Sequence, residues 1–206
     1  MGAMLASRMA EIRPYRASDL DELYAICLAT GDAGRDATQL CRDPRLLGHV
    51  YAAPYGVFAP ESCFVAEDDE GVCGYVIGAR DTPAFEERLE RDWWPGLRAR
   101  YARPATPTVT LDQRMQRLIH KPERTPRRIW EKYPAHLHID LLPRLQGRGF
   151  GRRMIDRWRE AVGVPVHLGV GMRNERAARF YRAYGFHEVE RHGAPYDVVV
   201  FGMAIG

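Results

Sequence analysis

The segment Gln146-Gly147-Arg148-Gly149-Phe150-Gly151 stands between a predicted strand and a predicted helix, and half of its residues are glycine. Glycine lets the backbone fold tightly and direct several N–H groups at one point. The N-terminus of the following helix adds partial positive charge there. The loop therefore predicts a site for a phosphate-bearing ligand, for which a diphosphate is the natural candidate. An ordinary tight turn without a ligand is the alternative.

Two arginines, Arg152 and Arg153, follow in the first helical turn, where their charge opposes the helix dipole. A phosphate nearby explains them better than helix stability does. A dinucleotide-binding loop would need an acidic residue ~20 positions later, at the end of the next strand, where residues 169–173 offer none. A P-loop would need Gly-Lys-Ser or Gly-Lys-Thr, which the sequence lacks.

Strand and helix patterns around the loop predict a mixed α/β (α+β) domain. A strand over residues 136–142 precedes the loop, and the helix after it has apolar residues along one side. Asn174 can cap a later helix that runs to Tyr184, where Gly185 suits a left-handed end. Ser18 opens an apparent capping box for an early helix that ends near Ala29. Further strands are predicted over residues 12–15, 63–67, 72–79, 164–170, 189–191 and 198–205, and a short helix over 40–51.

Residues 80–134 differ in character, because aromatic residues alternate with many arginines and several prolines. We interpret them as an insertion in a single domain that covers residues 9–206, after a disordered cloning remnant at 1–8. Thr82-Pro83, and Thr110 with Gln113, carry helix-start chemistry. We expect short helices there, lying over one edge of the core as a lid. Burial is expected to anchor this lid through Trp93, Trp94 and Trp130.

Composition bounds the remaining possibilities. A chain of 206 residues that is 46% apolar can bury the core of one domain. Its net charge of +3 is too small to indicate nucleic acid. The four cysteines form no C-x-x-C pair, which argues against a zinc site and favours a reduced cytoplasm. No apolar run approaches the ~20 residues of a membrane helix.

The residues from Leu142 to Gly151 resemble the signature of Gcn5-related N-acetyltransferases (GNAT), in which Gln or Arg precedes two residues, Gly, one residue, and Gly or Ala. A second block, from Asn174 through Phe180-Tyr181 to Gly185-Phe186, is similar to that superfamily's late helix. The resemblance implies a mixed central sheet flanked by helices. Its strands would splay to form a cleft for acetyl-coenzyme A, with the helical insertion placed before the motif strand.

A narrower resemblance covers the segment from Tyr133 to Pro143, which contains His138-Ile139-Asp140. It is similar to the acetyltransferase-like domain at the C-terminus of animal O-GlcNAcases and to free-standing bacterial relatives of that domain. The animal domain is regarded as a pseudo-acetyltransferase, so a cofactor pocket by itself does not establish turnover.

The GNAT resemblance also implies roles for single residues. In the superfamily, backbone groups of the strand before the loop hold the pantetheine and the acetyl carbonyl, and Leu141 and Leu142 occupy those positions here. Tyr181 matches a tyrosine that acts as general acid toward the departing thiolate; a buried core phenol is the alternative. The cofactor contacts implied are Leu141, Leu142, Gln146, Gly147, Arg148, Gly149, Phe150, Gly151, Arg152, Asn174, Ala178 and Tyr181.

A general base is expected from His138 or Asp140, which alternate along one strand and so share a face. Either could take a proton from an ammonium directly or through water, with Asp140 ranked first. The alternative is a structural hydrogen-bonded pair under the insertion. His120 and Tyr196 are weaker candidates.

Two functions from different classes remain open. The first is an acetyl-CoA-dependent N-acetyltransferase, an acyltransferase acting on a primary amine of a small molecule, peptide or protein. The second is a catalytically weak pseudo-acetyltransferase that binds acetyl-CoA as a regulatory domain. Neither requires a metal, a membrane or nucleic acid, and the chain could act as a monomer or homodimer.

Overall fold

The computed structural model describes residues 10–193 and 197–205, so the expected cloning remnant at 1–8 and the candidate Tyr196 lie outside the described residues. The strands form one sheet in the order β1-β2-β3-β4-β5-β7-β6. The strands are β1 (Glu11–Pro14), β2 (Cys63–Asp68), β3 (Gly71–Ala79), β4 (Ala135–Leu141), β5 (Val166–Gly171), β6 (His187–His192) and β7 (Val198–Met203). Among the described strands only β4 and β5 are parallel neighbours, so the sheet is mixed as expected.

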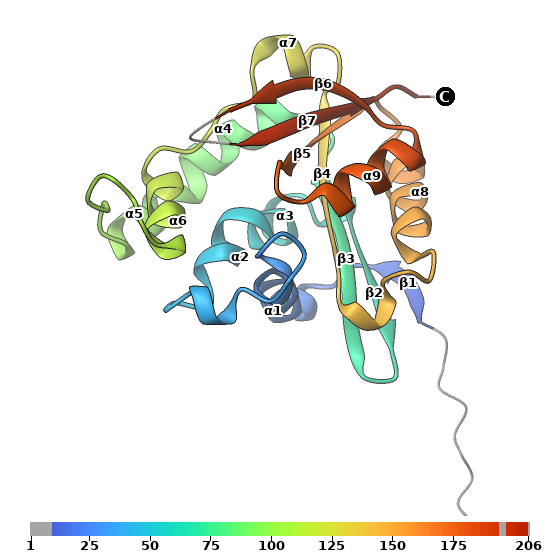
Figure 1. Ribbon diagram of the computed structural model, residues 1–206, viewed down its shortest axis with the longest axis horizontal. Coiled ribbons are helices and arrows are strands. Elements are labelled where there is room, and N and C mark those ends of the chain that lie inside the picture. Colours follow the sequence, from blue (N-terminus) through green and yellow to red (C-terminus); the bar gives the residue numbers. More distant parts are fainter. Residues whose placement is uncertain (1–9, 194–196, 206) are drawn as a thin grey trace, which may run out of the picture.

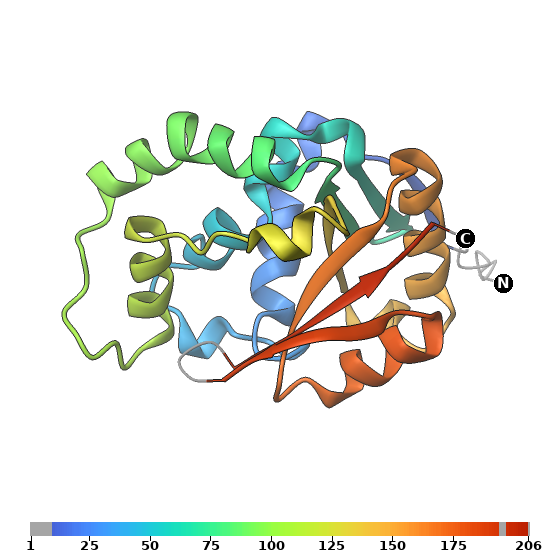
Figure 2. The same cartoon turned by 90° about the horizontal axis from the view of Figure 1, so that it is seen from above.

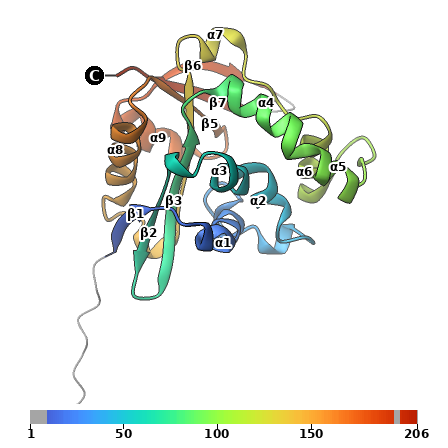
Figure 3. The same cartoon turned by 180° about the vertical axis from the view of Figure 1, so that it is seen from behind.

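Helices cover both faces of this sheet, and Figures 1 and 3 show the two sides. α8 and α9 lie on one side, and α1, α2 and α3 lie on the other. Each face carries its own apolar cluster, because side chains alternate along the strands. The helices are α1 (Leu20–Thr30), α2 (Leu46–Tyr51), α3 (Ala53–Phe58), α4 (Thr82–Asp92), α5 (Trp94–Arg100), α6 (Leu111–His120), α7 (Arg127–Trp130), α8 (Phe150–Val162) and α9 (Glu175–Tyr184).

Helices α4 to α7 fill the predicted insertion, and Figure 2 shows α4, α5 and α6 running out as an arm beside α2. α6 begins with the expected capping box, since Thr110 Oγ1 accepts from Gln113 N and Gln113 Oε1 accepts from Thr110 N. Asp81 rather than Thr82 caps α4, by accepting from Ala84 N. The insertion belongs to the core: Trp94 is buried, and Trp93 donates from Nε1 to His49 O.

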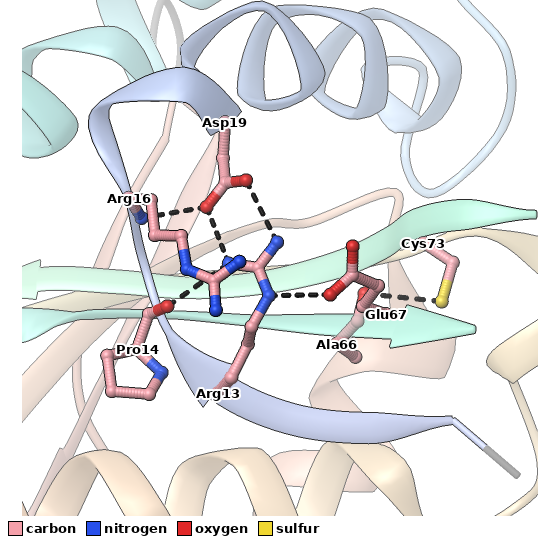
Figure 4. A network of polar contacts seen from close by, with 7 residues as sticks. All are labelled: Arg13, Pro14, Arg16, Asp19, Ala66, Glu67 and Cys73. Carbon is pink, nitrogen blue, oxygen red and sulfur yellow. Dashed lines mark hydrogen bonds and ion pairs between the residues drawn. The ribbon is translucent and has the colours of Figure 1, made fainter. Parts of the chain in front are cut away.

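The first helix begins differently from the prediction. Ser18 forms no side-chain cap, and Asp19 instead accepts hydrogen bonds from Arg16 N and from the Arg13 guanidinium. Arg13 also donates to Glu67 on β2 at 2.6 Å, as Figure 4 shows. Asp19 is buried, and a buried carboxylate needs such partners. The network therefore ties β1, β2 and the start of α1 together.

Candidate active site

The ladder between β4 and β5 breaks off early. Their pairing covers only Ala135 with Val166 and His136 with His167, so the two strands separate beyond that point. Ala135 N–H donates toward β5, to Pro165 O, whereas Leu142 N–H donates toward β3, to Cys73 O. Because backbone groups alternate between the two edges of a strand, the N–H groups of Ile139 and Leu141 point into the opening.

This alternation corrects one expectation. Both backbone groups of Leu142 are used inside the protein, since Leu142 N–H bonds Cys73 O and Leu142 O accepts from Leu145 N. Leu141 O accepts from the Gln146 side chain at 2.8 Å. The backbone N–H groups of Ile139 and Leu141 therefore face the opening, whereas that of Leu142 does not.

The glycine loop closes the end of this opening. Gly147 and Gly149 have φ of 74° and 79°, a conformation that L side chains disfavour, and Gly149 is the N-cap of α8. Two side-chain contacts fix the position of the loop. Arg144 Nε donates to Asp68 Oδ2 at 2.7 Å, and Arg176 donates to Gln146 Oε1 at 2.8 Å. Gly151 also lines the cleft, and it allows close packing, since a Cβ there would lie 3.0 Å from Phe180 Cζ.

A cleft of about 800 Å³ connects the loop with the opening, and we call it the loop cleft. It is lined by Ile139, Asp140 and Leu141 of β4, by Tyr181 of α9, and by the loop glycines. Four arginines also border it: Arg35, Arg152, Arg173 and Arg176. Glycine N–H groups, a helix N-terminus and these cations together suit an anionic, phosphate-bearing ligand.

Four other residues were expected to contact the cofactor, and of these only Asn174 lines the loop cleft. Asn174 borders the loop cleft, and its Oδ1 caps α9 by accepting from Ala177 N at 3.1 Å. Ala178 packs against the core, and its neighbour Ala177 lines the cleft instead. Phe150 is a buried core residue, and Arg148 is exposed on the loop.

Asp140 on β4 and Tyr181 on α9 both line the loop cleft. Asp140 Oδ2 accepts from the Tyr75 hydroxyl at 2.5 Å. Burial raises the pKa of Asp140, while the hydrogen bond from Tyr75 acts in the opposite direction. Burial, reinforced by the Asp140 charge, raises the pKa of Tyr181, which therefore keeps its proton at neutral pH. Tyr181 Oη forms no hydrogen bond within residues 10–193 and 197–205, so its proton is available to a ligand.

A second cavity, of about 670 Å³, adjoins β4 and β5 beside the loop cleft. We call it the histidine cavity, because His136, His138 and His167 line it together with residues of α3, α4, α6 and α7. Along β4, residues 136–138 line the histidine cavity and residues 139–141 line the loop cleft, so the two spaces meet on one strand. The described residues hold no group of metal-ligating side chains that could bind an ion.

His138 and Asp140 share a face of β4 as their spacing predicts, but they are not a hydrogen-bonded pair. Asp140 bonds Tyr75, and neither His138 ring nitrogen has a hydrogen-bond partner among the described residues. Burial and the nearby His167 lower the pKa of His138 to about 4, so its ring is neutral at pH 7. His120, the weaker candidate, bonds Tyr101 O with Nε2 and lies outside both cavities.

Sequence reasoning missed Tyr55, Tyr75 and Thr82, which contact the predicted residues from other elements. Tyr75 lies opposite Asp140 in the β3–β4 register, and Tyr55 reaches His136 from α3. Only the strand register and the docking of α3 bring them there. The four described cysteines are free thiols, and no described helix is long and apolar enough to cross a bilayer.

Comparisons with known proteins agree with this geometry. A family model described as "Acetyltransferase (GNAT) domain" matches residues 125–188. A solved structure titled SsHAT is 38% identical, covers 96% of this chain and 98% of its own, and has a TM-score of 0.86. A phosphinothricin acetyltransferase from Sinorhizobium meliloti, solved with acetyl-CoA, shares the fold at 14% identity and a TM-score of 0.54, over 96% and 89% of the two chains.

Protein O-GlcNAcase of Rattus norvegicus is 23% identical over 97% of this chain, and the match spans 22% of the O-GlcNAcase. The chain thus corresponds to about a fifth of that relative's length. Three findings lead to one assignment: the match to SsHAT over nearly the whole of both chains, the GNAT family model, and the splayed sheet with its glycine loop. The chain belongs to the Gcn5-related N-acetyltransferase superfamily and resembles the corresponding part of the O-GlcNAcases.

Proposed function

We propose that this chain is an acetyl-CoA-dependent N-acetyltransferase that acts on a primary amine. The observation that carries the proposal is the meeting of the loop cleft and the histidine cavity along β4. One space has the donors and cations for a diphosphate, and the other has room for a second molecule. Two substrates bound next to each other along one strand can bring their reacting atoms together.

The residues divide the binding of acetyl-CoA between them. The loop N–H groups at Gly147 and Gly149, with Arg152, would hold the diphosphate. The N–H groups of Ile139 and Leu141 would bond the pantetheine arm and the acetyl carbonyl. When bound, acetyl-CoA supplies an acetyl group activated as a thioester.

Proton transfer falls to the side chains near the junction of the two spaces. Tyr181 keeps its proton and has it free, so it would protonate the departing sulfur. Asp140 would accept the acceptor's proton, and its raised pKa makes it a stronger base than an exposed carboxylate. His138 is the second candidate, because its neutral ring opens on the histidine cavity.

A turnover assay tests the proposal directly. Purified protein is incubated with acetyl-CoA and a panel of primary amines, and released coenzyme A is measured with a thiol reagent. Binding of acetyl-CoA is measured in parallel by thermal shift. Coenzyme A release that depends on an amine supports the transferase. Binding of acetyl-CoA without release above background for any amine would replace it with the pseudo-acetyltransferase that binds the cofactor only.

A further inference from the structure

The histidine cavity contains a chain of hydrogen bonds with a defined direction. It runs from Tyr55 on α3 through His136 on β4 to Thr82 at the start of α4. Tyr55 Oη lies 2.9 Å from His136 Nε2, and Thr82 Oγ1 lies 2.8 Å from His136 Nδ1. Thr82 Oγ1 also donates to Pro134 O at 2.7 Å.

The direction follows from counting protons. A backbone carbonyl only accepts, so the single Thr82 hydroxyl proton is used on Pro134 O. The Thr82 oxygen must then accept from His136, which places the imidazole proton on Nδ1. Burial, with the neighbouring His167 and His138, holds the pKa of His136 well below its ordinary value, so the ring carries only that one proton.

It follows that His136 Nε2 bears a lone pair and accepts the Tyr55 proton. Burial raises the pKa of Tyr55, so the phenol remains protonated and that proton stays with His136. Tyr55 Oη then has only lone pairs left to offer a molecule in the cavity. The ring cannot easily turn away, because it stacks on Phe85 with centroids 4.7 Å apart.

The rest of the cavity wall combines apolar and aromatic residues with five charged ones, Glu86, Arg117, Lys121, Glu123 and Arg124. Tyr51, Leu89, Trp94 and Leu118 line it together with Phe85. Ion pairs engage both of its carboxylates, because Glu86 lies 3.6 Å from Arg124 and Glu123 lies 3.8 Å from Arg117. Two side-chain acceptors therefore face a molecule in the cavity: the oriented Tyr55 oxygen and the unprotonated ring nitrogen of His138.

We propose that the histidine cavity takes an amine on an apolar stem and that Tyr55 selects it by accepting a hydrogen bond from its N–H. Thr82 and His136 are positioning residues, because they commit the Tyr55 proton and so fix this oxygen as an acceptor. The inference rests on the proposed function, in which this cavity holds the acetyl acceptor.

Two probes of equal charge test the selection. 2-Phenylethylammonium and its N,N,N-trimethyl derivative share one apolar stem, and only the first has N–H groups. Their Kd values for the full chain are measured by titration calorimetry. The wild type is expected to prefer the first probe by about ten- to a hundredfold, the usual effect of one hydrogen bond to a charged group.

Variants separate this hydrogen bond from simple size selection. Tyr55→Phe keeps the ring and removes only the hydroxyl, so the preference should fall about tenfold or more, to the part that size and the other wall groups cause. Thr82→Val leaves Tyr55 intact but removes the acceptor for Nδ1–H. The imidazole proton can then move to Nε2 and point at Tyr55, and the preference should fall again. Tyr24→Phe removes a hydroxyl from another tyrosine–histidine pair, Tyr24 with His49 at 2.8 Å, outside this cavity, and should leave the preference unchanged.

The outcomes are distinct. A Tyr55→Phe variant with the wild-type preference overturns the proposal, as does wild type that binds neither probe. A Thr82→Val variant with the wild-type preference overturns the assigned direction of the chain. The ratio of the two Kd values is measured without turnover. If coenzyme A is released but Tyr55 does not affect the preference, this inference is wrong and the proposed transferase activity stands. If Tyr55 determines the preference but no amine causes coenzyme A release, the proposed transferase activity is wrong and this inference stands.

Discussion

Tyr75 Oη donates to Asp140 Oδ2 at 2.5 Å, across the register that pairs these residues on β3 and β4. This contact holds one oxygen of the partly buried Asp140 carboxylate at the edge of the loop cleft. It also lowers the pKa of Asp140 against the effect of burial. The base proposed for the reaction is therefore tuned by a residue on the neighbouring strand.

Tyr75→Phe should shift the acidic limb of the pH–rate profile to higher pH. Without the hydroxyl, the Asp140 carboxylate loses a stabilising donor and its pKa rises further, so a higher pH is needed to ionise it. Asp140→Asn should remove that limb, because an amide cannot take the proton. His138→Gln serves as the comparison. If only His138→Gln changes the limb, the imidazole is the base and Asp140 is structural.

Tyr181→Phe should lower kcat by about 10²–10⁴-fold, the usual contribution of a general acid. The Kd of acetyl-CoA should stay near the wild-type value, because the hydroxyl matters once negative charge develops on the sulfur. Steady-state kinetics and calorimetry on the same preparation check the two numbers. Equal losses in binding and in kcat would instead give Tyr181 a packing role, in line with its low exposure of 8%.

Gly149→Ala and Gly163→Ala form a matched pair at the two ends of α8. Both glycines have positive φ, 79° and 63°, and an added Cβ meets no atom within 4 Å at either. Each substitution should lower the free energy of unfolding by about 1–2 kcal/mol through backbone strain. Only Gly149→Ala should reduce the melting shift that acetyl-CoA causes, because Gly163 lies outside the loop cleft. If acetyl-CoA raised the melting temperature of both variants equally, the loop would not be part of the binding site.

The low pKa of His138 should make the protein sensitive to acid. The folded-state pKa of His138 is about 4, while an unfolded histidine titrates near 6.5, so the unfolded chain takes up protons first. The stability that His138 contributes is complete above pH ~6.5 and is lost as the pH falls toward 4. Denaturant unfolding of wild type and His138→Gln between pH 7 and 4.5 isolates this residue. The wild type should lose up to about 1.4 kcal/mol more per pH unit. If the free energy of unfolding changed with pH equally in wild type and His138→Gln, the lowered pKa of His138 would be contradicted.

The features that the sequence predicts well are local. Asn174, Gly185 and the Thr110–Gln113 box act within one turn of their own helices, and the structure has all three as expected. The hairpin of β2 and β3 and the two final strands are likewise confirmed. α3 and α5 were not predicted, since they have only 6 and 7 residues, too few for an apolar repeat to show in the sequence.

The long-range part of the site could not be read from spacing. Tyr55 and His136 are 81 residues apart, and Tyr75 and Asp140 are 65 apart. Their contacts depend on the register of β3 with β4 and on the docking of α3. Spacing also could not show that the backbone N–H of Ile139, and not that of Leu142, faces the opening between β4 and β5. Which edge of β4 a backbone group faces is set by where pairing with β3 begins.

The early end of the β4–β5 ladder leaves two strand edges that face each other inside one sheet. Open edges are templates for any extended chain that carries amide groups. Pantetheine contains two amides in line, so acetyl-CoA would complete the sheet in the manner of a short added strand. Cofactor binding should therefore also protect the protein against association, and self-association on storage should be slower in its presence. Light scattering at fixed protein concentration, with and without acetyl-CoA, measures this protection.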